Sequence, residues 1–181
     1  MKRKLLHIVD MQNDFILPDG KLSVAGANEL IIPANDFLHR TEFNKVIATF
    51  DTHYRKTYNK TSESKIFGSH CIYKTHGWEL AIQPRNYESV TKNEFDVWAK
   101  PHAINKALAG FYPADTEIYV MGVASDFCVK YAIVGYLNRG YNVTVIQDLC
   151  QGINKQICTV VKELNNKKIR LITSTQIQSQ R

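Results

Sequence analysis

Short apolar runs alternate along the chain with stretches that have helical spacing. The apolar runs are bounded by turn or polar residues, as is typical of buried strands, and comprise residues 5–9, 45–50, 87–91, 117–121, 142–146 and 168–172. Helical spacing predicts helices at 27–40 (with a regular start near Pro33), 130–140 and 154–164, and a short or irregular helix at 96–108. Strands that alternate with helices predict an α/β fold with a parallel sheet and right-handed crossovers.

Polar residues with distinctive chemistry follow several of these predicted strands. A doubly wound order, 3-2-1-4-5-6, would place the first and fourth strands side by side, and ligands bind at the carboxyl ends of such strands. The residues found at these ends are Asp10, Asp51, Lys92 and Cys128. Asp10 would then face Cys128 across the crevice. Taken singly, Asp10 could cap a turn, Lys92 could be a solvated surface charge, and Cys128 could be a small buried apolar residue.

Composition narrows the class of protein. The chain has 181 residues, 44% of them hydrophobic, which suits one domain over residues 1–181 with a full core. Its net charge is +6, but the basic residues are scattered and no nucleic-acid-binding motif occurs, so we expect no nucleic-acid partner. The four cysteines lack CxxC spacing, which indicates free thiols in a reducing compartment. No apolar run has the length of a membrane span, and Asp10 ends the first run too early for a secretion signal, so we expect a cytoplasmic protein without a membrane partner.

Cys128 is the candidate nucleophile. It follows the predicted strand 117–121 and would lie in the first turn of a helix, where free N–H groups and the helix dipole should lower the pKa of its thiol. With amides from the turn 122–125, these N–H groups could also hold an oxyanion. Asp10 could serve as the base for the thiol, and Lys92 as the cation that keeps the Asp10 carboxylate ionised.

A candidate metal site follows the second predicted strand. Asp51 and His53 are two residues apart at a strand end, so their side chains can point to one side and share a metal. The polar segment 54–87 is long for a loop in a compact domain, which indicates function or disorder. It carries three further candidates, Glu63, His70 and His76. A loop histidine is more often a surface residue, so His70 gains weight only beside Asp51 and His53.

Five motifs occur in order between residues 5 and 172. They are Asp10-Met-Gln-Asn-Asp-Phe15, Asp19-Gly-Lys-Leu-Ser-Val-Ala-Gly26, Asp51-Thr-His53, Lys92 and Gly122-Val-Ala-Ser-Asp-Phe-Cys128-Val. Together they resemble the isochorismatase-like cysteine hydrolases, and among these the nicotinamidases. The resemblance implies a three-layer α/β sandwich around a six-stranded parallel sheet. It also implies a catalytic triad of Asp10, Lys92 and Cys128, and a cis peptide between Val123 and Ala124.

The resemblance extends to a metal site. Asp51, His53 and His70 match the ligand pattern of nicotinamidases, a site that isochorismate hydrolases do not need. The segment Glu63-Ser-Lys-Ile-Phe67-Gly-Ser-His70 is similar to one that supplies a fourth ligand in some bacterial nicotinamidases, which makes Glu63 a candidate. Nitrogen and oxygen ligands predict a divalent cation, with zinc first and iron or manganese as alternatives.

A substrate pocket is implied as well. Phe15, Phe67 and Phe95 are candidates for packing on the substrate ring, with ordinary core packing as the alternative. The chain departs from the usual family pattern at Gly68-Ser69 and at Asp96-Val-Trp-Ala99, and we expect both departures to lie near the substrate.

The implied reaction is hydrolysis of nicotinamide to nicotinate and ammonia through a thioester on Cys128. Asp10 would act as the base, and the amides of Ala124 and Cys128 would be the oxyanion donors. One alternative is a hydrolase of the same fold that acts on another small amide, a ureido compound or isochorismate. A binding protein without activity is a second alternative, which the intact triad argues against. The expected partner is a small molecule, and the sequence leaves open whether the chain forms a homo-oligomer.

Overall fold

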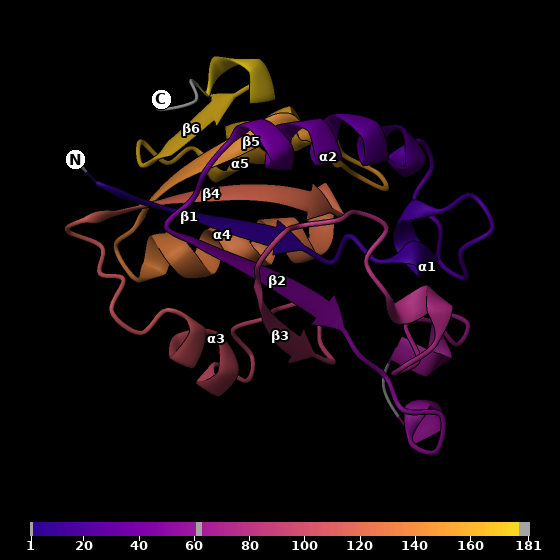
Figure 1. Cartoon of the computed structure of the whole chain (residues 1–181). Helices are drawn as coiled ribbons and strands as arrows, with labels where there is room; N and C mark the ends of the chain where they lie inside the picture. Colours follow the sequence, from indigo (N-terminus) through magenta and orange to yellow (C-terminus); the bar gives the residue numbers. More distant parts are fainter. Residues whose placement is uncertain (1, 61–62, 178–181) are drawn as a thin grey trace.

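The computed structural model describes residues 2–60 and 63–177, and these residues form one six-stranded sheet (Figure 1). The strands are β1 (Arg3–Val9), β2 (Lys45–Asp51), β3 (Glu88–Lys92), β4 (Thr116–Val123), β5 (Asn142–Gln151) and β6 (Ile169–Ile172). Their order is β3-β2-β1-β4-β5-β6, and every neighbouring pair is parallel. The predicted α/β class and the strand order 3-2-1-4-5-6 are thereby confirmed.

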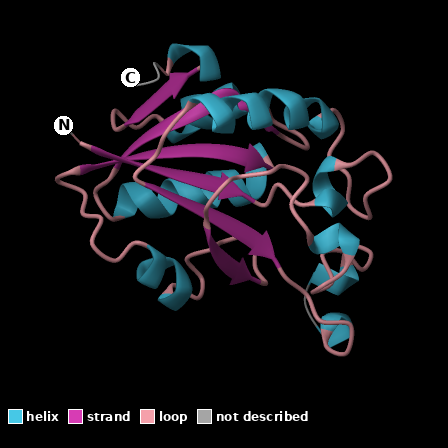
Figure 2. Ribbon diagram, in the orientation of Figure 1, coloured by secondary structure: helices cyan, strands magenta, loops and turns pink. Residues whose placement is uncertain are grey.

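Helices cover both faces of the sheet, which gives three layers (Figure 2). They are α1 (Asn13–Ile16), α2 (Ile31–Arg40), α3 (His102–Ala107), α4 (Lys130–Asn138) and α5 (Ile157–Leu164). One apolar core lies between the sheet and α3, α4 and α5, and a second lies between the sheet and α2. Short 3-10 turns occupy Ala27–Leu30, Tyr58–Lys60, Glu63–Lys65, His76–Trp78 and Ser174–Gln176. Among the described residues, no helix is long and apolar enough to cross a bilayer.

Two helices, α2 and α5, begin at different residues from those predicted. α2 begins at Ile31, so Pro33 lies in its first turn, where a missing N–H costs nothing. α5 begins at Ile157 rather than at residue 154, because the backbone N–H groups of Ile153 and Asn154 donate to the carboxylate of Asp126 instead of starting a helix.

The carboxyl ends of the strands meet at one edge of the sheet. Figure 1 shows β1, β2 and β4 pointing toward the side where α1 and the segment 52–87 lie. β1 and β4 are neighbours, yet the chain leaves them toward opposite sides of the sheet, so the strand order reverses between them. Ligands in open α/β sheets bind at this position, and residues after β1 and β4 reach it directly.

A glycine brings β4 close to the end of β1. Gly122 has a φ of 126°, and a Cβ built on it would lie 2.1 Å from the carbonyl oxygen of Val9. No other residue type could adopt this backbone and leave room for the neighbouring strand. The segment after Gly122 is therefore held against the segment that begins with Asp10.

The segment Asp96–Ala99, one of the two departures from the usual family pattern, directs two side chains into the apolar core. Val97 and Trp98 are buried in the core that α4 covers. The indole Nε1 of Trp98 donates to the carbonyl of Ala132 at 3.3 Å, and its ring lies against Gly135. Trp98 is therefore a core residue that needs a glycine on the facing helix.

We expect Gly135→Ala to lower the free energy of unfolding. A Cβ at this position would lie 1.8 Å from Trp98 Nε1, so the indole would have to leave its packed position. Overpacking of this kind costs about 1–3 kcal/mol. Urea denaturation measures the change. Gly68→Ala is the matched control, because a Cβ at Gly68 meets nothing within 4 Å; equal stability of the two variants would contradict the packing account.

His7 is a fully buried histidine in the middle of β1. Burial is the largest cause that lowers its pKa, from 6.5 to about 3, and the positive charge of Lys92 lowers it further. The ring is therefore neutral in the folded protein at ordinary pH. Its nitrogens lie 3.4 Å from Thr49 Oγ1 and 3.2 Å from the Tyr136 hydroxyl.

This buried histidine makes stability fall as the pH falls. Between pH 6.5 and about pH 3, His7 is protonated in the unfolded chain but neutral in the folded protein. Its contribution to the free energy of unfolding is therefore fully present above pH 6.5 and is lost as the pH falls toward 3. The loss attributable to His7 reaches roughly 4 kcal/mol near pH 3. We expect urea denaturation from pH 7 to pH 4 to show a shallower decline for His7→Gln, which has no group that titrates. Parallel declines for the two proteins would show that His7 is not the cause.

Candidate active site

Asp10, Lys92 and Cys128 come together at the carboxyl edge of the sheet. Lys92, the last residue of β3, places its Nζ 2.6 Å from Asp10 Oδ2 and 3.5 Å from Cys128 Sγ. All three side chains are almost completely buried. Asp10 has a φ of 47°, a left-handed conformation at the point where β1 ends. Its Oδ1 is buried without a hydrogen-bond partner in the described part of the chain, so one carboxylate oxygen remains available to a ligand or a thiol.

The pKa of Lys92 depends on its burial and on the neighbouring charged groups. Burial alone would lower the pKa of Lys92, but Asp10, Cys128 and Asp51 outweigh it and raise the pKa well above its usual value. Lys92 is therefore an ammonium ion with a carboxylate on either side, since Asp51 Oδ1 lies 4.0 Å from Nζ.

The pKa of the Cys128 thiol is raised, whereas the sequence predicted that it would be lowered. Burial raises its pKa well above the usual value, the nearby Asp10 and Asp51 carboxylates raise it further, and Lys92 only partly opposes them. The helix predicted from residue 130 is confirmed, since α4 begins at Lys130, but Cys128 does not lie in its first turn, because Ser125–Val129 form a π-type turn with Phe127 at φ −125°, ψ −105°. Cys128 thus lies in a kinked turn ahead of the regular helix, and its proton stays on sulfur until a base removes it.

The turn ahead of Cys128 contains the cis peptide that the resemblance implied. It joins Val123, the last residue of β4, to Ala124. The carbonyl of Ala124 then accepts the N–H groups of Phe127 and Val129, at 3.0 and 3.2 Å. These bonds fold the turn tightly and hold the thiol beside Lys92.

Asp51, His53 and His70 form a cluster that could hold a metal ion. Their ligand atoms lie within 4.8 Å of one another, and all three residues are buried. Asp51 Oδ2 is 3.0 Å from His53 Nε2 and 3.1 Å from His70 Nε2, while Asp51 Oδ1 has no hydrogen-bond partner among the described residues. One carboxylate and two imidazoles suit a divalent transition metal. Burial would raise the pKa of Asp51, but Lys92 and the two histidines outweigh it and lower the pKa, so the carboxylate is ionised.

Glu63 cannot be placed in this cluster. Its backbone belongs to the 3-10 turn Glu63–Lys65, but its side chain lies outside the described residues, so its role as a fourth ligand stays a prediction. His76, the third histidine candidate in the segment, is exposed and lies apart from the cluster.

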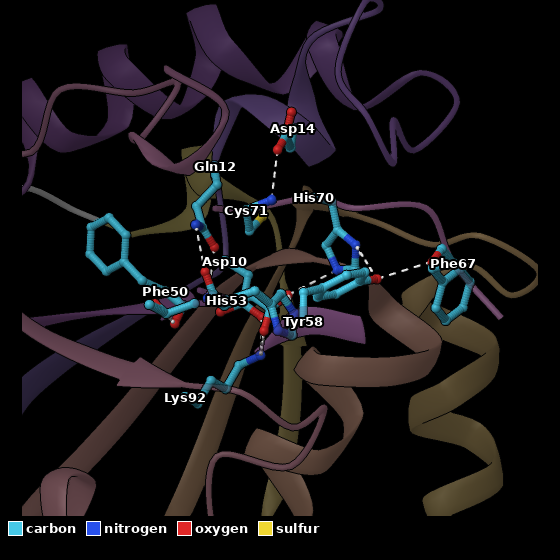
Figure 3. Close-up of polar contacts among 12 residues, drawn as sticks. Asp10, Gln12, Asp14, Phe50, His53, Tyr58, Phe67, His70, Cys71 and Lys92 are labelled. Atoms are coloured by element: carbon cyan, nitrogen blue, oxygen red, sulfur yellow. Dashed lines mark hydrogen bonds and ion pairs between the residues drawn. The ribbon is translucent and has the colours of Figure 1, made fainter. Parts of the chain in front are cut away.

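Two residues of the first motif hold the metal cluster, and sequence reasoning assigned them no role (Figure 3). Gln12 Oε1 accepts the N–H of Asp51 at 2.7 Å, and its Nε2 donates to the Asp51 carbonyl at 2.9 Å. Asp14 Oδ2 accepts the N–H of Cys71 at 2.6 Å, which fixes the residue after His70. Both side chains are buried, and their place in one motif with Asp10 was the available signal.

His70 is oriented from behind by its own loop. Its Nδ1 lies 2.8 Å from the Gly68 carbonyl, so Nδ1–H donates there while Nε2 faces Asp51. Tyr58 donates its hydroxyl to the same carbonyl at 2.9 Å. Such partners fix the tautomer of a histidine ligand. Nothing in the sequence around Tyr58 pointed to this contact.

An apolar pocket opens onto Cys128 and the metal cluster. Phe15, Phe67 and Phe95, the three candidates from sequence, all line it. Phe127 lines it as well, with its ring 5.5 Å from that of Phe95, and was not anticipated. The remaining lining residues are Leu22, Val24, Asp51, His70, Val123, Ala124, Cys128 and Ile153. The pocket therefore offers flat apolar walls with the thiol and the ligand set within reach.

The chain is similar to a known protein family and to proteins of known structure. Residues 4–176 match the model of the isochorismatase domain. The nicotinamidase of Saccharomyces cerevisiae is 28% identical, over 88% of this chain and 94% of that protein. The structure of PnC1 from L. infantum in complex with nicotinate superimposes with a TM-score of 0.82 at 22% identity, over 99% of this chain and 96% of that one. The pyrazinamidase of Pyrococcus horikoshii in complex with zinc gives a TM-score of 0.79 at 23% identity, over 94% of this chain and 99% of that one.

These structural likenesses show a shared fold, and the family model spans nearly every residue from β1 to the final 3-10 turn. The order of motifs along the sequence, the strand order and the cis peptide agree with that match. The chain belongs to the isochorismatase family.

Proposed function

We propose that this protein is a metal-dependent amidohydrolase that converts nicotinamide to nicotinate and ammonia through a thioester on Cys128. The observation that carries the proposal is the meeting of two clusters, Asp10–Lys92–Cys128 and Asp51–His53–His70, at one apolar pocket. The relative in Saccharomyces cerevisiae is named a nicotinamidase, and the L. infantum neighbour holds nicotinate, which supports this substrate class.

The first half-reaction forms the thioester. Asp10 takes the Cys128 proton as the sulfur attacks the amide carbon, because the buried thiol does not ionise by itself. The carbonyl oxygen becomes an oxyanion, which the backbone amides of Ala124 and Cys128 stabilise. A donor of this kind is worth roughly 3–4 kcal/mol. Asp10 then returns the proton to the amide nitrogen, and ammonia leaves as the C–N bond breaks.

The second half-reaction releases the acid. Asp10 accepts a proton from water while the water oxygen attacks the thioester carbon. The C–S bond then breaks, Asp10 returns this proton to the Cys128 sulfur, and the acid loses its remaining proton to solvent and leaves as nicotinate. Lys92 has the same role in both half-reactions. Its ammonium, 2.6 Å from Asp10 Oδ2, orients the carboxylate when it acts as the base.

The residues around the metal cluster orient the substrate. Asp51, His53 and His70 would hold a divalent cation, with zinc favoured by the ligand types and Glu63 as a possible fourth ligand. When bound, the cation supplies a Lewis acid for the ring nitrogen and for water. Phe15, Phe67 and Phe95 pack on the ring from the pocket walls.

We expect Cys128→Ala to abolish ammonia release from nicotinamide, with a loss of at least about 10⁴-fold in kcat, because Cys128 is the only described residue lining the pocket that carries a thiol or hydroxyl. A coupled ammonia assay measures it. Cys158→Ala is the matched control, since Cys158 is an exposed cysteine remote from the pocket, and it should keep full activity. Wild-type protein that releases no ammonia from nicotinamide, but turns over another small amide, a ureido compound or isochorismate, would favour the alternative hydrolase.

We expect His53→Ala to lose its bound metal and most of its activity. Removing one ligand should weaken the metal by more than about 100-fold, since even changes behind a ligand cost roughly 10–100-fold. Elemental analysis after desalting, and the rise in Tm on adding zinc, measure the effect. His76→Ala is the control, because it removes an exposed histidine from the same segment. Wild-type protein that contains no metal, and gains neither stability nor activity from zinc, iron or manganese, would refute metal dependence.

A further inference from the structure

We propose that His7 is a positioning residue for Asp10 and that it acts through Thr49. The inference rests on the proposed function, in which Asp10 is the base. His7 lies in the layer beneath the catalytic cluster and touches none of the reacting groups. Its effect would come from two hydrogen bonds in series that end on the backbone of Asp10.

His7 lies on β1 and Thr49 on the neighbouring strand β2, where Thr49 pairs with Val9, the residue before Asp10. Thr49 and His7 are both fully buried. His7 Nε2 is 3.4 Å from Thr49 Oγ1, and the backbone N–H of Asp10 donates to the same oxygen at 3.3 Å. The Thr49 hydroxyl in turn lies 3.5 Å from the Ile8 carbonyl. Thr49 thus connects the backbone of Ile8, near the end of β1, to the backbone of Asp10, the proposed base.

The directions of these bonds form a consistent set. The Thr49 hydroxyl has one hydrogen, which it donates to the Ile8 carbonyl, so its oxygen accepts from both Asp10 N–H and His7 Nε2–H. A neutral His7 then has its lone pair on Nδ1, where the Tyr136 hydroxyl donates at 3.2 Å. The chain of donors runs from Tyr136 through His7 to Thr49. Burial lowers the pKa of His7 to about 3, so the ring stays neutral and keeps one lone pair at working pH.

The backbone of Asp10 has particular need of such support. Its φ of 47° lies in a region that residues other than glycine seldom adopt, and surrounding contacts must maintain it. This conformation sets the direction of the carboxylate, whose Oδ2 is 2.6 Å from Lys92 Nζ. Without His7, the Thr49 hydroxyl loses the donor that fixes its lone pairs toward Asp10. The base would then be less well placed, and a misplaced catalytic group slows the chemical step more than it weakens binding.

The test compares three substitutions at one position. His7→Leu fills a similar volume without a hydrogen bond. His7→Gln can place its amide N–H near the position of Nε2, whereas His7→Asn is equally polar but too short to reach Thr49. We expect His7→Leu and His7→Asn to lower kcat for ammonia release about 10-fold with KM and metal content unchanged, and His7→Gln to recover most of the loss. If His7→Leu does not fold, the Gln and Asn pair carries the same comparison.

A double-mutant cycle tests whether His7 acts through Thr49. Thr49→Val should lower kcat by a similar factor. The double variant with His7→Leu should have the same kcat as Thr49→Val alone, because His7 has no effect on Asp10 once the Thr49 hydroxyl is gone. Thr144→Val is the control. Thr144 is also fully buried in the sheet, but it lies on β5 and bonds Glu117 and Arg170, so its loss should leave kcat unchanged.

The alkylation rate of Cys128 by iodoacetamide, followed by mass spectrometry at one pH, separates this proposal from the proposed function. It needs no substrate, yet it depends on Asp10 as the base for the thiol. Slower alkylation in His7→Leu and recovery in His7→Gln would support positioning even if the wild-type protein released no ammonia from nicotinamide. Wild-type kcat and alkylation in His7→Leu would overturn it. Absence of rescue by Gln, or losses that multiply in the double variant, would overturn it as well.

Discussion

The buried ion pair between Lys92 and Asp10 is the interaction on which the rest of the site depends. Desolvation costs several kcal/mol for each ion, and close geometry must offset it. The 2.6 Å contact requires β3, β2 and β1 to end at the same level, which the pairing of Asp51 with Lys92 achieves. The sheet register therefore has an electrostatic consequence. A shift of one residue would place the ammonium among apolar side chains with no carboxylate beside it.

The same charges connect the thiol to the metal cluster. Asp51 lies 4.0 Å from Lys92 on one side and 3.0 Å from His53 on the other, so it belongs to both halves of the site. Burial is the largest cause that raises the pKa of Cys128, Asp10 and Asp51 raise it further, and Lys92 opposes them only in part. Cys128 is therefore a thiol in the resting protein, next to its proposed base Asp10, and the thiolate forms only as the sulfur attacks the substrate.

Backbone conformations that are costly elsewhere cluster around this edge of the sheet. Asp10 and Cys71 both have positive φ, at 47° and 44°, and each such residue costs on the order of 1–3 kcal/mol. Side chains behind them hold these conformations: Thr49 accepts the Asp10 N–H, and Asp14 accepts the Cys71 N–H. The buried polar residues of the two neighbouring strands thus act as a support for the site, and they explain why a core strand contains a histidine.

The sequence by itself determined the six parallel strands and the placing of Asp10, Lys92 and Cys128 at their carboxyl ends, whereas the strand order was taken from doubly wound folds and confirmed by the structure. Apolar runs mark strands, and the ends of parallel strands share an edge, so local pattern and topology suffice. The tertiary structure alone decided the raised pKa of Cys128, the π-type turn before α4, the place of Trp98 in the core, and the contacts of Gln12, Asp14, Tyr58 and His7. Each of these depends on burial or on a partner distant in sequence. Desolvation and hydrogen bonding are set by what surrounds a group in space, and hydrophobic spacing along the chain carries no record of it.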